Sequence, residues 1–319
     1  MNKLGYIELL NKMKEYWSEL RQLLKDKKLS YNDIEGLKKT HFINRFDDAI
    51  KTAGKFAVCS LSDINLMLRS CKEIQEDKNR FIPLKMVDEK WEINKEKLSD
   101  NRYNPPEKGF MYLGIDMKND PQNINYIKRN CLKEIRAFED TSNEYVSTLR
   151  FKTTYNSKNK KVLDFSKISN YNTTDDIIRE FEKYIEKNKN VNGDFKEVVE
   201  SILIKMILKL INDSTFRKVN KKICNKEELK EKLRVEYAPF HAFANYIESI
   251  GYAGIIYDST VCDGLNLVLF NRDDVEFCDE IMIDNIKDLE YQYCGEKIYP
   301  AVKKIYDDGT VILEDGSTL

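Results

Sequence analysis

Apolar side chains recur every three or four positions in the first part of the chain, a spacing typical of an amphipathic helix. They are Tyr6, Leu10, Met13, Trp17, Leu20 and Leu24. Further apolar patterns cover residues 34–50. Another helix is predicted for residues 62–76, with Ser62 and Asp63 as candidate caps. We interpret residues 1–79 as a small helical N-terminal domain.

Beyond residue 79 the chain alternates between strand and helix patterns. Short apolar runs predict strands at residues 111–115, 145–154, 162–165, 255–257 and 265–270. Helical spacing predicts helices at residues 124–138, 175–187, 195–211 and 238–249. We assign residues 80–290 to one α+β domain, and residues 291–319 to a C-terminal extension that forms a β-hairpin around Gly309.

The composition excludes several classes of function. Among 319 residues, 41% are apolar, and 53 basic against 54 acidic side chains leave a formal charge of −1. Such a balance provides no overall field for nucleic acid or an anionic membrane. The chain shows neither a signal-peptide pattern nor an apolar run that could cross a membrane. We therefore expect a cytoplasmic protein without nucleic-acid or membrane partners.

The cysteines and histidines favour no metal site. Seven cysteines are scattered without a Cys-x-x-Cys pair, and His41 and His241 are the two histidines. Structural zinc needs clustered ligands, and disulfide frameworks usually use an even number of cysteines. The sequence predicts a protein of a reducing compartment with no bound metal.

Candidate chemistry lies between residues 101 and 134. Arg102 stands in a loop, Tyr112 in an apolar run, and Glu134 on a predicted helix. A guanidinium, an aromatic face and a carboxylate are the groups that hold a dinucleotide by its phosphates, stack on its base and stabilise a sugar cation. Each also has a structural interpretation, as a solvated loop arginine, a core tyrosine and a surface acid.

Several short motifs occur in the order found in a known family. They are Arg102-Tyr103-Asn104-Pro105, Met111-Tyr112-Leu113-Gly114, Leu132-Lys133-Glu134-Ile135-Arg136, Val162-Leu163-Asp164-Phe165, Gly254-Ile255-Ile256-Tyr257-Asp258-Ser259 and Asn266-Leu267-Val268-Leu269-Phe270. Together they resemble the RES domain, named for its arginine, glutamate and serine, over about residues 81–276. The resemblance implies an α+β fold related to the ADP-ribosyltransferase toxins, with a split, strongly bent sheet and flanking helices. This chain looks like a long member with an added helical N-terminus.

The resemblance also implies an activity. Members of the family consume NAD as a substrate, by hydrolysis, by phosphorolysis or by modifying a protein, and many are toxins of bacterial toxin–antitoxin pairs. We expect an NAD glycohydrolase that acts as a toxin or defence effector by depleting NAD. Its expected partners are NAD, a candidate antitoxin and a second copy bound through the N-terminal helices. The alternatives are an ADP-ribosyl or phosphoribosyl transferase and a catalytically inactive NAD-binding module.

The same resemblance assigns roles to individual residues. Glu134 would hold the nicotinamide ribose and stabilise the sugar cation, with Glu139 as the fallback. Arg102 would clamp the pyrophosphate, and Tyr112 would stack on nicotinamide or its ribose. Ser259 would hydrogen-bond phosphate or ribose. Two weaker cofactor-binding candidates are Asn266 and His241, either of which is equally consistent with a structural role.

Overall fold

The structure is a computed structural model that describes residues 3–87, 90–93, 103–105, 108–118, 123–139, 142, 144–168, 170–187, 195–215, 226–259, 261–278, 280–289, 302–305 and 311–313. Its helices are α1 (Lys3–Lys25), α2 (Ile34–Lys38), α3 (His41–Ala53), α4 (Asn123–Glu134), α5 (Thr174–Lys187), α6 (Phe195–Thr215) and α7 (Lys226–Ser249). Its strands are β1 (Val58–Ser60), β2 (Leu66–Lys72), β3 (Leu84–Val87), β4 (Lys90–Ile93), β5 (Met111–Asp116), β6 (Tyr145–Thr153), β7 (Lys161–Asp164), β8 (Gly254–Asp258), β9 (Leu265–Leu269), β10 (Val275–Phe277), β11 (Met282–Asn285), β12 (Val302–Ile305) and β13 (Val311–Leu313).

Helix α1 turns its apolar stripe into the protein interior. Trp17 is 3% exposed, packs against Phe42 of α3 and Phe240 of α7, and donates its indole N–H to Ser214 Oγ of α6 at 3.1 Å. Helix α3 begins after Thr40, whose Oγ1 accepts the N–H of Ile43 and so caps the helix. The stripe at the start of the sequence therefore packs against helices from both ends of the chain.

The strands form one large mixed sheet in the order β1-β7-β8-β9-β5-β2-β6-β10, with β11 also paired to β6. Among the described strand pairs of this sheet, only β7 and β8 run parallel. The sheet bends so far that Val162 of β7 and Val275 of β10 share an apolar cluster with Met67 of the central β2. Lys160, just before β7, also binds the Asp274 carboxylate beside β10 at 2.6 Å. The sheet thus curls around its own core, and no pairing among the described strands closes it into a barrel.

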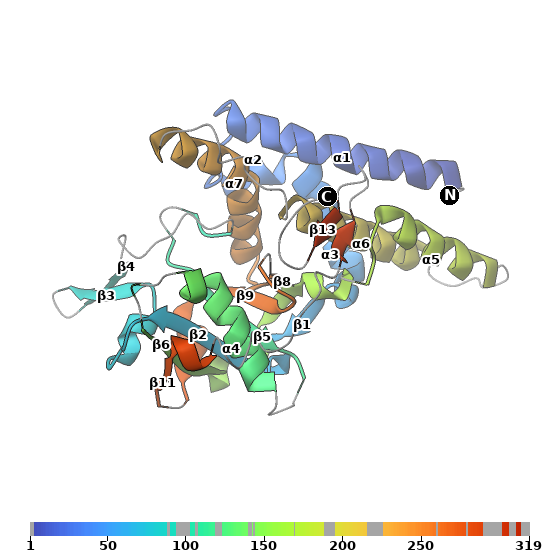
Figure 1. Cartoon of the computed structure of the whole chain (residues 1–319). Helices are drawn as coiled ribbons and strands as arrows, with labels where there is room; N and C mark the ends of the chain where they lie inside the picture. The colour runs from blue at the N-terminus through green and yellow to red at the C-terminus, as the bar shows by residue number, and fades with distance from the viewer. Residues whose placement is uncertain are drawn as a thin grey trace.

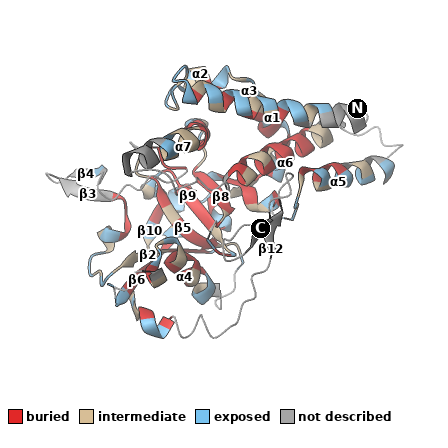
Figure 2. Cartoon of the chain, turned by 45° about the horizontal axis from the view of Figure 1, so that its top comes forward, coloured by how far each residue is buried: buried red, intermediate tan, exposed pale blue. Residues whose placement is uncertain are grey.

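Helices cover the outer face of this curled sheet (Figure 1). Helix α4 packs there on β2, where Ile127 and Cys131 cluster with Leu68. The helices α1, α3, α6 and α7 bury a second cluster that includes Ile255 of β8 and Val268 of β9, and the buried faces of these helices turn toward the sheet in Figure 2. The N-terminal helices therefore share a hydrophobic core with the rest of the chain.

Strand β2 replaces the helix predicted for residues 62–76, so that prediction was wrong. Leu68 faces α4, whereas Met67 faces the interior of the curled sheet. A strand buried on both faces presents a continuous apolar run, which cannot be distinguished from a buried helix by periodicity alone. The correction matters because β2 is an interior strand of the sheet, paired with β5 on one side and β6 on the other.

The sheet splits between β2 and β5. The two strands pair only where Leu66, Met67 and Leu68 face Asp116, Ile115 and Gly114. Beyond Leu68, β2 continues on β6 alone as far as Lys72, while β5 continues on β9 as far as Met111. The predicted α+β class, with a bent, open sheet, flanking helices and a helical N-terminal segment, is confirmed.

The C-terminal strands and the hydrophobicity of the helices concern two further predictions from the sequence. Strands β12 and β13 pair antiparallel near the C-terminus. Among the described helices, none combines the length and apolar content that crossing a bilayer requires.

Candidate active site

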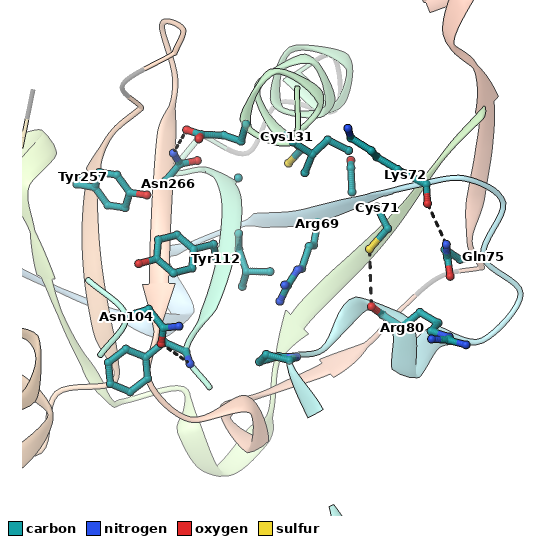
Figure 3. Close-up of a pocket in the computed structure, with 17 residues that line it drawn as sticks. Arg69, Cys71, Lys72, Gln75, Arg80, Asn104, Tyr112, Cys131, Tyr257 and Asn266 are labelled. Carbon is teal, nitrogen blue, oxygen red and sulfur yellow. Dashed lines mark hydrogen bonds between the residues drawn. The ribbon is translucent and has the colours of Figure 1, made fainter. Parts of the chain in front are cut away.

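A pocket of about 640 Å³ fills the opening where β2 and β5 diverge (Figure 3). Residues 69–72 of β2 line one side, residues 112–114 of β5 line the other, and Glu134 at the end of α4 also reaches it. Its described lining carries three cations, Arg69, Lys72 and Arg80, against one carboxylate. The pocket is therefore cationic along β2 and acidic beside α4.

Glu134 is held by two side chains from the sheet. Its Oε1 accepts hydrogen bonds from Ser259 Oγ at 2.7 Å and from Asn266 Nδ2 at 2.5 Å. Because Glu134 is the last residue of α4, the helix dipole disfavours its charge, and these two donors offset that cost. Both donors reach Oε1, and no described residue hydrogen-bonds Oε2.

Ser259 directs its hydroxyl proton toward Glu134. The residue follows β8 and is fully buried. Its Oγ accepts the backbone N–H groups of Val261 and Cys262 at 3.2 and 3.3 Å. Since those contacts occupy the lone pairs, the hydroxyl is available to donate to Glu134.

Tyr112 stands on the β5 wall and is joined to the preceding loop. Its Oη accepts the backbone N–H of Tyr103 at 3.1 Å, and Tyr103 is buried among aromatic rings that include Phe240 and Tyr257. Asn104, also in the pocket lining, accepts the Phe110 N–H at 3.1 Å. The Tyr-Asn-Pro segment of the sequence motif therefore contributes Asn104 to the pocket lining.

Arg69 is the residue that the sequence analysis missed. It lies near the centre of Figure 3, between Tyr112 and Cys71. Its Nη1 is shielded from water and has no hydrogen-bond partner among the described residues, and burial lowers the pKa of the guanidinium, which still stays protonated at neutral pH. A guanidinium nitrogen that is shielded from water and has no acceptor is costly, so this partly buried cation is complementary to an anion.

The floor of the split is tightly packed. Cys131 of α4 donates its thiol to the Leu68 carbonyl at 3.4 Å, and burial raises the pKa of this thiol to about 12, so it stays neutral. A Cβ added to Gly114 would lie 2.6 Å from Cys131 Sγ. Glycine at that position therefore allows α4 to approach the sheet and bring Glu134 to the pocket.

The structure brings together four of the residues proposed from sequence. Glu134, Asn266 and Tyr112 line the pocket, and both Ser259 and Asn266 donate to the Glu134 carboxylate. Ser259 itself is fully buried, lies outside the lining and reaches the site through this hydrogen bond. His241 does not line it: this residue of α7 is 4% exposed and its ring contacts Tyr31 and Tyr237.

The described part of the structure leaves out the side chains of two predicted residues. Arg102 lies outside the described residues, and so does the side chain of Glu139, whose backbone ends a short helical turn at Ala137–Glu139. One signal in the sequence could have identified Arg69: an arginine that directly follows the apolar run Leu66–Leu68. Interpreting residues 62–76 as a helix concealed it.

Within the part of the chain that the structure describes, no group of three or more histidine, cysteine, aspartate or glutamate side chains is arranged to hold a metal ion. The polar groups of the described pocket lining include two guanidiniums, an ammonium, two phenols, three amides, a hydroxyl and a carboxylate. They are suited to a ligand with anionic and hydroxyl groups.

Comparisons with known proteins give one structural neighbour. No family model and no curated protein matches the chain. Among solved structures, the chain is similar to one in the M. tuberculosis MbcT–MbcA toxin–antitoxin complex, at 10% sequence identity and a TM-score of 0.32, over 76% of this chain and 95% of that chain. At this identity and TM-score, the similarity assigns neither an activity nor a partner to this chain.

Proposed function

We propose that the chain is an enzyme that cleaves the bond between nicotinamide and ribose in NAD, with water as the acceptor. One observation carries the proposal: the same split-sheet pocket is lined by Arg69, whose Nη1 is shielded from water, and by the Glu134 carboxylate, which is held by Ser259 and Asn266. That pairing fits a ligand with a pyrophosphate and a ribose.

Cleavage of the nicotinamide–ribose bond requires mainly that a site orient the ribose and stabilise positive charge on it. Nicotinamide is a cationic leaving group, so the bond breaks through a sugar with oxocarbenium character. The protein must orient the ribose and provide negative charge where positive charge develops. The Glu134 carboxylate would do this through Oε2 while Oε1 remains bonded to its two donors.

The cationic side of the pocket would hold the phosphates. Arg69 offers a planar fork of N–H donors that matches a phosphate, and Lys72 and Arg80 add positive charge along the same wall. Three cations against one carboxylate leave the described lining with an excess of two positive charges, the magnitude of the charge on a pyrophosphate. Tyr112 would provide a stacking face for the nicotinamide ring or its ribose.

The experiment is incubation of the purified chain with NAD, followed by separation of the products. We expect equal amounts of free nicotinamide and ADP-ribose. Nicotinamide without free ADP-ribose, with label from NAD recovered on a macromolecule, would indicate a transferase instead. Binding of NAD without release of nicotinamide would contradict the proposal and support a binding module.

A further inference from the structure

A buried asparagine lies behind the carboxylate of the pocket. Asn130 is one helical turn before Glu134 on α4 and is 2% exposed. Its Nδ2 donates to Asn266 Oδ1 at 3.1 Å and to the Leu265 carbonyl at 3.2 Å, and its Oδ1 accepts from Cys262 Sγ at 2.7 Å. Asn130 lies outside the pocket lining but contacts a residue that holds Glu134.

The hydrogen bond from Asn130 bears on which end of the Asn266 amide, its donor or its acceptor, faces Glu134. A primary amide is nearly symmetric in shape, and rotation by half a turn exchanges its donor and its acceptor. With Nδ2 toward Glu134, the Asn266 amide stabilises the carboxylate, and with Oδ1 toward it the two oxygens repel. The Asn130 donor at Asn266 Oδ1 favours the first orientation.

We propose that Asn130 is a positioning residue, which orients the Asn266 amide so that its donor faces Glu134. The inference rests on the proposed function for its consequence in catalysis. Its structural part, the orientation of one amide, can be measured without any activity.

Asn130 is itself fixed in place. The Leu265 carbonyl accepts from its Nδ2 and the Cys262 thiol donates to its Oδ1, so its own orientation is set by both neighbours. A Cβ added to Gly264 would lie 2.9 Å from Asn130 Nδ2 and 3.0 Å from its Cγ. Gly264→Ala therefore tests the position of Asn130 without removing any polar group.

Substitutions at Asn130 separate positioning from folding. Asn130→Asp has the same shape but presents acceptors to Asn266, which would turn the Asn266 amide around. We expect kcat for nicotinamide release to fall about 100-fold in Asn130→Asp and about tenfold in Asn130→Ala, as for loss of an oriented donor. The dissociation constant for NAD should change by less than about threefold, because the phosphate contacts remain.

Asn245→Ala is the matched control. Asn245 is 4% exposed, and its Nδ2 also donates to a backbone carbonyl, that of Tyr31, and to an asparagine Oδ1, that of Asn32. This variant should lower the melting temperature about as much as Asn130→Ala while leaving kcat unchanged. An equal loss of kcat in both variants would overturn the proposal, since it would reduce the effect to lost stability.

A double-mutant cycle tests whether Asn130 affects Glu134 through Asn266. If Asn130 acts through Asn266, adding Asn130→Ala to Asn266→Ala should change kcat by less than about twofold. Independent, multiplying effects would contradict the proposal. Gly264→Ala should behave like Asn130→Ala in this cycle and covers the case in which Asn130→Asp does not fold.

A measurement that does not depend on activity distinguishes the positioning role of Asn130 from the proposed cleavage of NAD. The side-chain amide protons of Asn266, assigned in nuclear magnetic resonance spectra by their loss in Asn266→Ala, should exchange with solvent about tenfold faster in Asn130→Ala than in the wild type. Unchanged exchange would refute the positioning role. Faster exchange in a protein that does not cleave NAD would refute the proposed function alone.

Discussion

At the scale of single residues, the pocket has a guanidinium and a carboxylate with hydrogen-bonding capacity that no described residue uses. Arg69 has a shielded Nη1 without a partner among the described residues, and Glu134 binds both Ser259 and Asn266 through the one oxygen Oε1. A guanidinium nitrogen shielded from water usually finds an acceptor, because leaving it without one costs about 1–3 kcal/mol. The cost at Arg69 is understandable if an anion binds there.

Replacing Arg69 should therefore weaken NAD binding. Arg69→Ala removes the charge-assisted hydrogen bonds, and we expect the dissociation constant to rise about 10- to 100-fold, corresponding to roughly 1.5–3 kcal/mol. Arg69→Lys should restore only part of the affinity, because an ammonium lacks the planar fork. Isothermal titration calorimetry with NAD measures the effect.

Arg179→Ala provides the comparison for that measurement. Arg179 is an exposed residue of α5 whose side chain pairs with Asp176. Arg179→Ala removes one positive charge at a position away from the pocket, so the affinity for NAD should be unchanged. Equal affinity in the wild type and Arg69→Ala would show that the guanidinium does not bind the ligand.

The two donors at Glu134 give a second prediction. Ser259→Ala and Asn266→Ala should each lower kcat by about 10- to 100-fold, because each removes a donor that fixes the carboxylate. Since the two donors bind the same oxygen, the double variant should lose less than the product of the single effects. Steady-state rates of nicotinamide release test this, and full additivity would argue against a shared action on Glu134.

Sequence reasoning identified one side of the pocket better than the other. Glu134, Ser259 and Asn266 stand in recognisable motifs, and their convergence follows from the order of the strands. Arg69 has no such motif, and its importance depends on where β2 leaves β5, which is a tertiary feature. His241 lies in an apolar helix that passes elsewhere, and spacing along the chain could not reveal this.

At the scale of elements, the approach of α4 to the sheet determines where Glu134 lies. Gly114 of β5 and Cys131 of α4 face each other at the floor of the split, and a Cβ on Gly114 would be 2.6 Å from the sulfur and 3.1 Å from Ile127 Cγ2. Both neighbours are buried in a packed cluster, so neither can yield cheaply. Helix α4 would have to move instead.

Gly114→Ala should accordingly reduce both stability and activity. Overpacking of this kind costs about 1–3 kcal/mol, and displacement of Glu134 should lower kcat further than the loss of stability explains. Thermal unfolding and nicotinamide release, measured on the same samples, separate the two effects.

Gly54→Ala is a suitable control for this pair of measurements. A Cβ there would meet Ile50 at 3.5 Å, an ordinary contact, so both quantities should stay near the wild-type values. A Gly114→Ala protein with wild-type kcat and melting temperature would contradict the account of α4.

Elements were easier to predict from sequence at the surface than in the middle of the sheet. The helices α1, α3 and α4 have one apolar face, and their periodicity is therefore visible in the sequence. Strand β2 is covered on both faces, by α4 and by the interior of the curled sheet, so its period of two is lost. The split follows from the pairing of β2, which cannot be predicted while β2 is taken for a helix.

At the scale of the whole molecule, the N-terminal helices are part of the core. Trp17 of α1 contacts α3, α6 and α7, and Arg21 of α1 pairs with Glu236 of α7 at 2.6 Å. The same cluster reaches Tyr103 and Tyr257, which stand next to the pocket. Stability of the helices and geometry of the pocket are thus connected through shared side chains.

Trp17→Ala should destabilise the entire chain. Loss of a buried tryptophan costs about 3–5 kcal/mol, and we expect one cooperative unfolding transition at a lower temperature. Trp17→Phe, which keeps most of the ring contacts, is the milder comparison. Calorimetry that showed a separate early transition for the N-terminal helices, with the remainder unchanged, would contradict a shared core.

A toxic role follows from the proposed activity and is testable in cells. Expression of the wild-type chain in bacteria should lower the NAD content and arrest growth, because hydrolysis is irreversible and NAD is used throughout metabolism. Glu134→Gln at equal abundance should leave both unchanged. Growth arrest with normal NAD, or NAD loss with the Glu134→Gln chain, would contradict toxicity through NAD cleavage.

The most direct test compares turnover with binding at one carboxylate. Wild type and Glu134→Gln are mixed with NAD, and nicotinamide release is followed while NAD affinity is measured on the same preparations. We predict that Glu134→Gln binds NAD within about threefold of the wild type and releases nicotinamide at least about 1,000-fold more slowly, because the stabilising charge is lost but the phosphate contacts remain. Release at the wild-type rate in Glu134→Gln would contradict the central claim.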